Sequence, residues 1–413
     1  MNNKKYWLKI EPYIIMVIKK KKVLFYNTLS GEKFEYQIKN SLQKIIRDLD
    51  NKENLRVIEL ADIDLINRDV KEFITTIRNL FIGDIIDASL SECRPVQFTP
   101  LLNNQRDIKK LQKDGIEINQ DLKKYLSEIT IYLNGDCKLT CNFCDKANNQ
   151  FFCCTKNNFG ELEFEIIENI FKQIAGTNIS YINFIGGNLL NYSKLFKIPS
   201  LLEKYKIKGD FYMYYENFIT DYLKFPIIPS NLYEIRIIIP SQPSNQKKDE
   251  LFNIIKSSKL NASLVFILES NADFEINEQV ESLGINYEFY PFYNKSNYSF
   301  FEENVFLDHD DIFNKIFSHK DIFRNMSLNS NSFGKLIINN QGSVFGSFKS
   351  VPIGNLINNT INEIIYKEFS DGNNWLNTRE EKPCIDCLYQ YFCPSPSAYE
   401  KAIGKINLCS VCK

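Results

Sequence analysis

The most constraining feature of this sequence is the alternation of strand-like and helix-like segments that begins at residue 128. Short apolar runs bounded by polar or turn residues predict strands at Glu128–Leu133, Tyr181–Ile185, Phe211–Tyr215, Tyr233–Ile239, Ser263–Leu268 and Asn286–Tyr290. A helical stripe through Leu162, Ile166 and Ile170 separates the first two strands. Repeated strand–helix units favour a parallel sheet, so residues 128–325 are predicted to form an α/β fold, a partial (β/α)6 barrel similar to a TIM barrel. A ligand site is expected at the carboxyl ends of its strands.

The 413 residues exceed one ordinary core, and two further units are expected on either side of the barrel. The pattern of residues 1–100 predicts a small winged-helix-like module. Its expected strands are Tyr6–Ile10, Tyr13–Ile18, Val23–Tyr26 and Arg56–Leu60, and its expected helices are Ile38–Leu49 and Val70–Leu80. The polar residues 101–127 read as a linker. The pattern of residues 326–413 predicts a hairpin that turns at Gln341-Gly342, a helix near Ile361–Phe369 and a cysteine-rich tail. The apolar core of this unit is thin, so we expect it to need metal for folding.

The charge and the cysteine content exclude several classes of protein. With 50 basic and 51 acidic side chains, the chain carries no broad basic surface for nucleic acid. It has neither a signal peptide nor an apolar stretch of about 20 residues, so no membrane span is predicted and a cytoplasmic location is expected. Thiols stay reduced in that compartment, and the eleven cysteines are therefore better explained by metal binding than by disulfides.

Three cysteines follow the first predicted barrel strand, at Cys137, Cys141 and Cys144. Their spacing lets one short loop present three thiolates to one metal cluster. A 4Fe–4S cluster normally takes four cysteines, so a three-thiolate loop would leave one iron open to a small-molecule ligand. Zinc and unliganded thiols remain alternatives, although zinc sites usually show paired C-x₂-C units or a nearby histidine.

The run Cys137-x₃-Cys141-x₂-Cys144, with Phe143 before its last cysteine, resembles the signature of radical S-adenosylmethionine (radical SAM) enzymes. The pair Gly186-Gly187 after the second strand resembles their Gly-Gly-Glu-Pro motif, although an isolated pair also predicts a tight turn. The resemblance implies that S-adenosylmethionine binds the open iron and that Phe143 packs near its adenine. Reduction then gives a 5′-deoxyadenosyl radical.

Three positions of the implied cofactor pocket depart from the family pattern. Asn188 stands where relatives carry the glutamate that takes the methionine ammonium, and a neutral amide loses the charge-assisted part of that bond. Glu216 lies in a stretch that matches the family's Thr-Asn-Gly only loosely. At the end of the fourth strand, only Ser241 is available for the ribose.

The C-terminal residues 333–412 resemble the SPASM extension, which holds two auxiliary clusters in radical enzymes that modify peptides. The resemblance implies one retained auxiliary 4Fe–4S cluster on Cys384, Cys387, Cys393 and either Cys409 or Cys412, with zinc as the alternative metal. Cysteines expected for the other cluster are absent, because Gly346, Ser347 and Ser397 stand near those positions.

These resemblances imply a radical SAM/SPASM-type protein that matures a ribosomally synthesised peptide. The N-terminal module resembles a precursor-recognition element, which would take the peptide as an added strand near Tyr13–Ile18 or Val23–Tyr26. The tail around Cys387–Cys393 resembles the pseudo-radical-SAM proteins of a Bacteroidales peptide (GG-type) maturation system, and the alternative is therefore a catalytically impaired partner that binds the precursor for a separate maturase. The implied partners are the precursor peptide, a second radical SAM maturase, and a reductant such as flavodoxin or ferredoxin.

Overall fold

The computed structural model describes residues 4–90, 93–96, 122–139, 141, 150, 160–179, 181–226, 231–258, 260–281, 284–348, 350–371 and 374–411. Side chains of residues 277–279 and 371 are outside this description. Of the residues named for the candidate sites, Phe143, Cys144 and Cys412 lie outside the described residues, as does most of the predicted linker.

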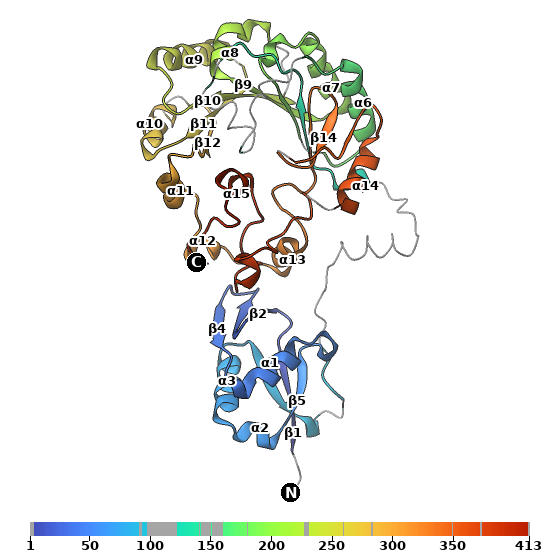
Figure 1. Ribbon diagram of the computed structural model, residues 1–413, viewed down its shortest axis with the longest axis vertical. Helices are drawn as coiled ribbons and strands as arrows, with labels where there is room; N and C mark the ends of the chain where they lie inside the picture. The colour runs from blue at the N-terminus through green and yellow to red at the C-terminus, as the bar shows by residue number, and fades with distance from the viewer. Residues whose placement is uncertain are drawn as a thin grey trace.

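A large sheet forms the centre of the molecule, and all six predicted strands are present in it. They are β7 (Glu128–Tyr132), β8 (Tyr181–Ile185), β9 (Lys208–Tyr214), β10 (Tyr233–Ile239), β11 (Ala262–Leu268) and β12 (Tyr287–Pro291). Each strand pairs in parallel with the one before it. The sheet curves into an arch, and among the described strands its two ends, β12 and β15 (Gly354–Asn355), do not pair with each other (Figure 1).

Helices cover the convex face of this arch, as Figure 1 shows. They are α6 (Phe164–Ile174), α7 (Ile198–Tyr205), α8 (Tyr215–Asp221), α9 (Asn245–Ser258) and α10 (Ile276–Glu281). Strand residues alternate between the two faces. Ile129 and Ile131 of β7 join the apolar core under the helices, whereas Glu128 and Thr130 face the concave side. None of the described helices combines the length and apolar character needed to cross a membrane.

The C-terminal part of the chain lies against the concave side of the arch (Figure 1). It contains α11 (Tyr298–Asn304), α12 (His309–Ile312), α13 (His319–Ser327), β13 (Lys335–Ile338), β14 (Ser343–Phe345), β15 (Gly354–Asn355), α14 (Ile361–Asp371) and α15 (Ala398–Ile403). The predicted hairpin is present, and Gly342 takes a left-handed φ of 77° at its turn. Strand β13 pairs in parallel with β7, so the hairpin extends the large sheet.

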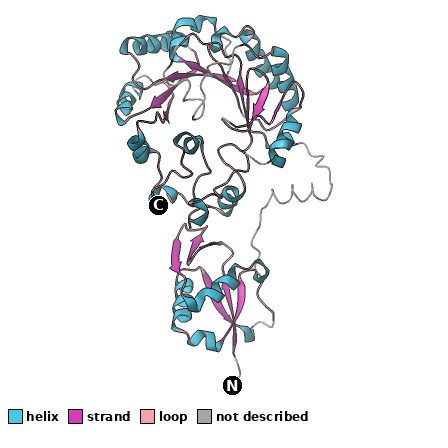
Figure 2. Cartoon of the chain, viewed as in Figure 1, coloured by secondary structure: helices cyan, strands magenta, loops and turns pink. Residues whose placement is uncertain are grey.

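Two three-stranded antiparallel sheets make up the N-terminal unit (Figure 2). Its elements are β1 (Lys5–Ile10), β2 (Ile14–Lys19), β3 (Lys22–Asn27), β4 (Lys33–Gln37), α1 (Gln43–Asp50), β5 (Val57–Ala61), α2 (Asp62–Ile66), α3 (Arg68–Asn79) and β6 (Gly83–Asp87). The orders are β5-β1-β6 and β2-β3-β4. The sequence did not predict β4, α2 or β6.

The pairing corrects the prediction that Val23–Tyr26 is an exposed strand edge. These residues belong to β3, which pairs with β2 on one side and with β4 on the other. Among the described strands, the edges of this sheet are β2 and β4. Residues of β4 alternate between exposed and half-buried, whereas Ile15 and Val17 of β2 are buried.

One apolar cluster joins the N-terminal unit to the C-terminal part. Ile15, Val17, Leu24 and Tyr26 pack against Phe317, Phe392 and their neighbours. The rings of Tyr26 and Phe392 have centroids 4.7 Å apart, and Phe317 N–H donates to the Tyr26 hydroxyl at 2.8 Å. The Lys19 ammonium donates to Gln390 at 2.6 Å across the same contact.

Tyr26→Phe is expected to lower the free energy of unfolding by about 1–3 kcal/mol, because the buried N–H of Phe317 loses its acceptor. Urea denaturation followed by fluorescence measures the change. Tyr13→Phe is the matched control, since the Tyr13 hydroxyl donates to Phe81 O at an exposed position, and a change within about 0.5 kcal/mol is expected there. Equal effects of the two substitutions would contradict the stabilising role of the hydrogen bond between Phe317 N–H and the Tyr26 hydroxyl.

Candidate functional site

The first cysteine group begins just past the carboxyl end of β7, at the predicted edge of the sheet. Cys137 and Cys141 are both partly exposed. The amide of Asn217, near the start of α8, donates to Cys137 Sγ over 3.9 Å. The structure therefore brings the cysteine loop against the segment that follows β9.

Tyr214, the last residue of β9, lies beside Cys141. Burial raises the pKa of Tyr214 well above its ordinary value, and the adjacent Cys141 thiol raises it further. Burial also raises the pKa of Tyr215 to about 12, with contributions from Glu216 and Cys141. These two tyrosines therefore place phenol groups close to the Cys141 thiol.

The pair Gly186-Gly187 lets two chain segments approach closely. A Cβ on Gly187 would lie 2.2 Å from the carbonyl oxygen of Asp136, and a Cβ on Gly186 would lie 2.4 Å from Asn134 Oδ1. Asn188 N–H donates to Asp136 O at 2.6 Å across this approach. The glycines therefore hold the start of the cysteine loop against the end of β8.

Asn134 is a site residue that the sequence analysis missed. It is 1% exposed, its Nδ2 donates to Asn188 O at 2.8 Å, and its Oδ1 accepts from Gly187 N–H at 3.0 Å. An asparagine placed directly after a buried strand and shortly before Cys137 was the available signal, because a buried amide requires partners.

The oxygen and the nitrogen of the Asn188 side-chain amide both form hydrogen bonds within the protein. Its Oδ1 accepts from Leu190 N–H at 3.2 Å, and its Nδ2 donates to Asp221 Oδ2 at 3.0 Å. Asp221 also forms an ion pair with Lys224 at 2.8 Å. The Lys224 ammonium holds the pKa of Asp221 below its ordinary value, and Asn188 adds to that effect. Asp221 was not predicted, since it lies far from Asn188 in sequence.

Glu216 and Ser241 lie at the same edge of the sheet, each with a partner of its own. Glu216 pairs with Lys247 at 2.6 Å, and the Ser241 hydroxyl donates to Asp273 at 2.8 Å. Asn188 and Glu216 line one cavity of about 610 Å³ together with Lys138 of the cysteine loop, whereas Ser241 does not line it.

The second cysteine group converges in the C-terminal tail. Cys384, Cys387, Cys393 and Cys409 line one small cavity of about 10 Å³. Nitrogen donors approach three of the sulfurs: Arg379 Nη1 lies 3.7 Å from Cys384 Sγ, Tyr389 N–H 3.4 Å from Cys387 Sγ, and Asn407 Nδ2 3.3 Å from Cys409 Sγ. Burial raises the pKa of the Cys393 thiol to about 12.

Across the described residues, no three metal-ligating side chains converge closely enough to bind a single ion. Zinc draws four sulfurs to about 2.3 Å from one centre. A cluster instead distributes its cysteines over several irons, so its ligands lie farther apart. The four thiols line one cavity, and a zinc ion and a 4Fe–4S cluster remain alternative occupants of this cysteine group.

Arg379 fixes the position of this tail. Its guanidinium pairs with Glu400 at 2.7 Å, and the two side chains are 9% and 7% exposed. It also donates to the carbonyl oxygens of Pro394 and Ile406. This buried pair was not predicted from the sequence.

No protein-family model matches the sequence, and no curated protein matches it. Among solved structures, Streptococcus suis SuiB bound to the precursor peptide SuiA is 15% identical, with a TM-score of 0.43 and coverage of 98% of this chain and 100% of that one. SuiB bound to S-adenosylmethionine is 12% identical, with a TM-score of 0.41 and the same coverage. Hexahistidine-tagged anSMEcpe with bound AdoMet is 13% identical, with a TM-score of 0.44 and coverage of 68% of this chain and 92% of that one.

Proposed function

We propose that this chain is a radical SAM/SPASM-type iron–sulfur protein acting in the maturation of a ribosomally synthesised peptide. The observation that carries the proposal is the position of Cys137 and Cys141. They lie at the carboxyl ends of a curved parallel sheet, where such sheets bind ligands, and with Cys144 in the sequence they have the three-then-two spacing of a cluster loop. The proposed domains are 1–100, 128–325 and 326–413, joined by the segment 101–127.

In this proposal Cys137, Cys141 and Cys144 hold a 4Fe–4S cluster, and one iron remains for S-adenosylmethionine. When bound, these groups supply a 5′-deoxyadenosyl radical. The side chains of Asn217 and Tyr214 would orient the first two thiolates, because they contact Cys137 and Cys141. Phe143, Gly186, Gly187, Asn188, Glu216 and Ser241 are the residues proposed for the cofactor pocket.

We further propose that Cys384, Cys387, Cys393 and Cys409 hold one auxiliary 4Fe–4S cluster. The shared cavity and the donors to the sulfurs support this assignment. For the N-terminal unit we propose precursor binding by strand addition at an edge of the β2-β3-β4 sheet, either at β2, which covers the predicted Tyr13–Ile18, or at β4, since each of them pairs only with β3 among the described strands. A flavodoxin or ferredoxin would supply the electron, in the cytoplasm.

Cys141→Ala is expected to abolish formation of 5′-deoxyadenosine, because a two-thiolate loop no longer holds the cluster. The rate of deoxyadenosine formation should fall by more than the roughly 100-fold loss of activity that is typical when an outer-shell contact of a metal site is removed. Anaerobic reconstitution, reduction with dithionite and chromatographic detection of deoxyadenosine provide the measurement.

Cys93→Ala is the matched control, because Cys93 is exposed and lies outside both cysteine groups. It should retain the activity of the parent protein. Parent protein that is fully loaded with iron and still releases no deoxyadenosine would contradict the enzymatic proposal.

The geometry of Asn188 favours a second candidate function, that of a partner that binds the precursor without radical chemistry. Asp221 engages the amide nitrogen of Asn188, and Leu190 N–H occupies one of the two lone pairs of its oxygen, so this neutral side chain offers an ammonium group less than the glutamate of the family pattern would. In this case, precursor-peptide affinity measured by fluorescence anisotropy should survive Cys141→Ala, and deoxyadenosine should be absent in both proteins. A separate radical SAM maturase would then perform the chemistry.

A further inference from the structure

The second cysteine group lies at a point where separate parts of the tail meet. Its thiols come from residues 384–393 and from the end of the described chain: Cys384, Cys387, Cys393 and Cys409. Asn407 and Arg379 line the same cavity as these thiols. The side chains around the sulfurs therefore belong to the site together with the sulfurs.

A metal on these thiols would leave negative charge on the sulfurs. A zinc ion or an oxidised 4Fe–4S core neutralises only about half of the charge of four thiolates. The remaining charge would lie in a largely enclosed place, since Cys384 is 5% exposed. Buried charge without hydrogen bonds is costly, so donors to the sulfurs are expected to decide how tightly either metal is held.

Asn407 makes the shortest donor contact to these sulfurs among the described residues. Its Nδ2 lies 3.3 Å from Cys409 Sγ. The corresponding distances are 3.4 Å from Tyr389 N–H to Cys387 and 3.7 Å from Arg379 Nη1 to Cys384. An N–H donor stabilises a thiolate more than a thiol, because the charged sulfur is the stronger acceptor.

The other two donors differ from Asn407 in kind. Tyr389 contributes its backbone N–H, which every residue except proline supplies. The Arg379 guanidinium pairs with Glu400 at 2.7 Å, so a carboxylate already balances its charge. Of the described donors, Asn407 is thus the one that comes from a neutral side chain.

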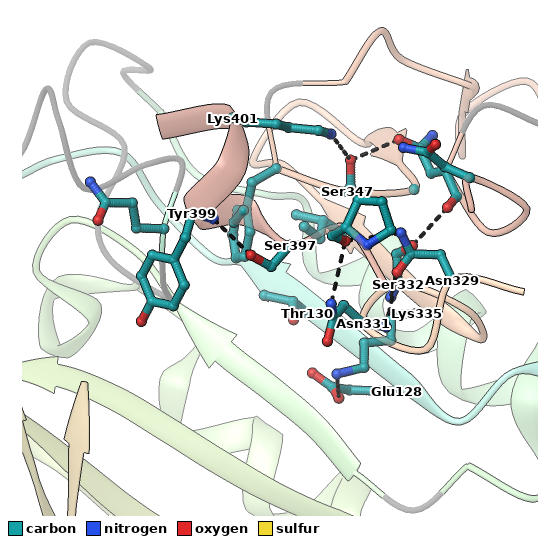
Figure 3. Close-up of a pocket in the computed structure, with 18 of the residues that line it drawn as sticks. Glu128, Thr130, Asn329, Asn331, Ser332, Lys335, Ser347, Ser397, Tyr399 and Lys401 are labelled. Carbon is teal, nitrogen blue, oxygen red and sulfur yellow. Dashed lines mark hydrogen bonds and ion pairs between the residues drawn. The ribbon is translucent and has the colours of Figure 1, made fainter. Parts of the chain in front are cut away.

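Asn407 and Cys409 lie on a segment that the fold holds in place. Before them, α15 is attached through Lys401, whose Nζ donates to Ser347 Oγ at 3.1 Å (Figure 3). Leu307 exchanges backbone hydrogen bonds of 3.0 Å with the residues on either side of Cys409. The segment is therefore preorganised, and the contact between the Asn407 amide and Cys409 costs little conformational entropy.

We propose that Asn407 is a positioning residue of the second metal site and that its amide donates a hydrogen bond to the metal-bound thiolate of Cys409. The donor would hold the Cys409 side chain towards the cavity and stabilise the charge on its sulfur. The inference rests on the proposed function, because it requires a metal on the four cysteines. It also makes Cys409 rather than Cys412 the fourth ligand.

The test measures metal release from the full chain in a Cys141→Ala background, in which the second site is expected to contribute the metal. Anaerobically reconstituted protein is mixed with excess EDTA, and released iron and zinc are followed by mass spectrometry. Asn407→Asp should release metal about 10–100-fold faster than its parent, because an acceptor replaces the donor. Asn377→Asp is the matched control: Asn377 is exposed and lies outside the cysteine cavity, so the release rate should not change.

Asn407→Leu distinguishes a donor role from a structural one. Aspartate keeps the shape and the Oδ1 oxygen of asparagine, whereas leucine keeps neither the oxygen nor the amide but adds no charge. The donor role therefore predicts faster release from Asn407→Asp than from Asn407→Leu, and a structural role predicts the reverse order. Asn407→Leu should itself release metal faster than the parent, which keeps the test decisive if Asn407→Asp takes up no metal.

Two results would overturn this inference alone: an unchanged release rate in Asn407→Asp, or faster release from Asn407→Leu than from Asn407→Asp. A Cys141→Ala protein that binds no metal after reconstitution would overturn the proposed metal site and the inference with it. Because the readout is metal content, the result is independent of the deoxyadenosine assay.

Discussion

Cys409→Ser is expected to remove the metal from the C-terminal cysteine site and to unfold the tail. Cys409 lines the same cavity as Cys384, Cys387 and Cys393. Its neighbours also attach the chain end to Leu307, which donates to Leu408 O at 3.0 Å and accepts from Ser410 N–H at 3.0 Å. Structural metal binding contributes on the order of 10 kcal/mol to folding in small metal-dependent domains, so loss of one ligand should have a large effect.

Iron and sulfide analysis after anaerobic reconstitution measures this result, together with a thermal melt. The parent protein should contain roughly eight irons and the variant roughly four, since the first site is unaffected. Cys93→Ser serves as the control and should leave both quantities unchanged. Metal loss in Cys412→Ser with retention in Cys409→Ser would instead make Cys412 the fourth ligand, and zinc in place of iron would establish the alternative metal.

Arg379→Gln is expected to lower the free energy of unfolding by about 3–5 kcal/mol, because it leaves the carboxylate of Glu400 buried without its counterion. The substitution also removes donors to Pro394 O and Ile406 O. Urea denaturation monitored by circular dichroism measures the loss.

The control for Arg379→Gln is Lys5→Gln, which breaks the ion pair with Glu59 at 2.9 Å. Those two side chains are 58% and 43% exposed, so a change of at most about 1 kcal/mol is expected. The double variant Arg379→Met/Glu400→Leu should recover much of the lost stability, since it buries no unpaired charge. An Arg379→Gln cost as small as that of Lys5→Gln would show that the pair does not hold the tail.

The central sheet could be predicted because its strands are local apolar runs. The prediction was least accurate at β9, which begins at Lys208 rather than at Phe211. The missing segment contains Asp210, whose carboxylate pairs with Arg236 at 2.9 Å on the next strand. A charged residue inside a strand is stabilised only by that distant partner, and a local pattern does not reveal it.

The N-terminal unit shows the same limit. Strand β4 has the sequence Lys-Phe-Glu-Tyr-Gln, in which only Phe34 and Tyr36 pack on the core. Its presence depends on pairing with β3, and that pairing also made Val23–Tyr26 a central strand instead of an edge. Strand pairing is a tertiary property, so the alternation of apolar and polar residues alone could not distinguish a central strand from an edge strand.

The candidate sites also contain features that depend on local sequence and features that depend on contacts between distant segments. Cysteine spacing predicted which thiols belong together, and the described members of the second group do converge on one cavity. The partners of Asn134 and Asp221 lie on segments far apart in sequence, so the sequence indicated at most the position of Asn134 after a buried strand and showed no sign of Asp221. Cys144, Cys412 and Phe143 remain predictions.

The contact between the N-terminal unit and the tail has a consequence for synthesis. Lys19 and Gln390, which meet across it, are 371 residues apart in the chain. At about 5–20 residues per second, a ribosome needs roughly 20–75 seconds to make the second after the first. During that interval Ile15, Val17 and Leu24 have no partner surface from the tail. The nascent chain should therefore present this apolar face to chaperones, and truncated products that end before residue 392 should aggregate through it.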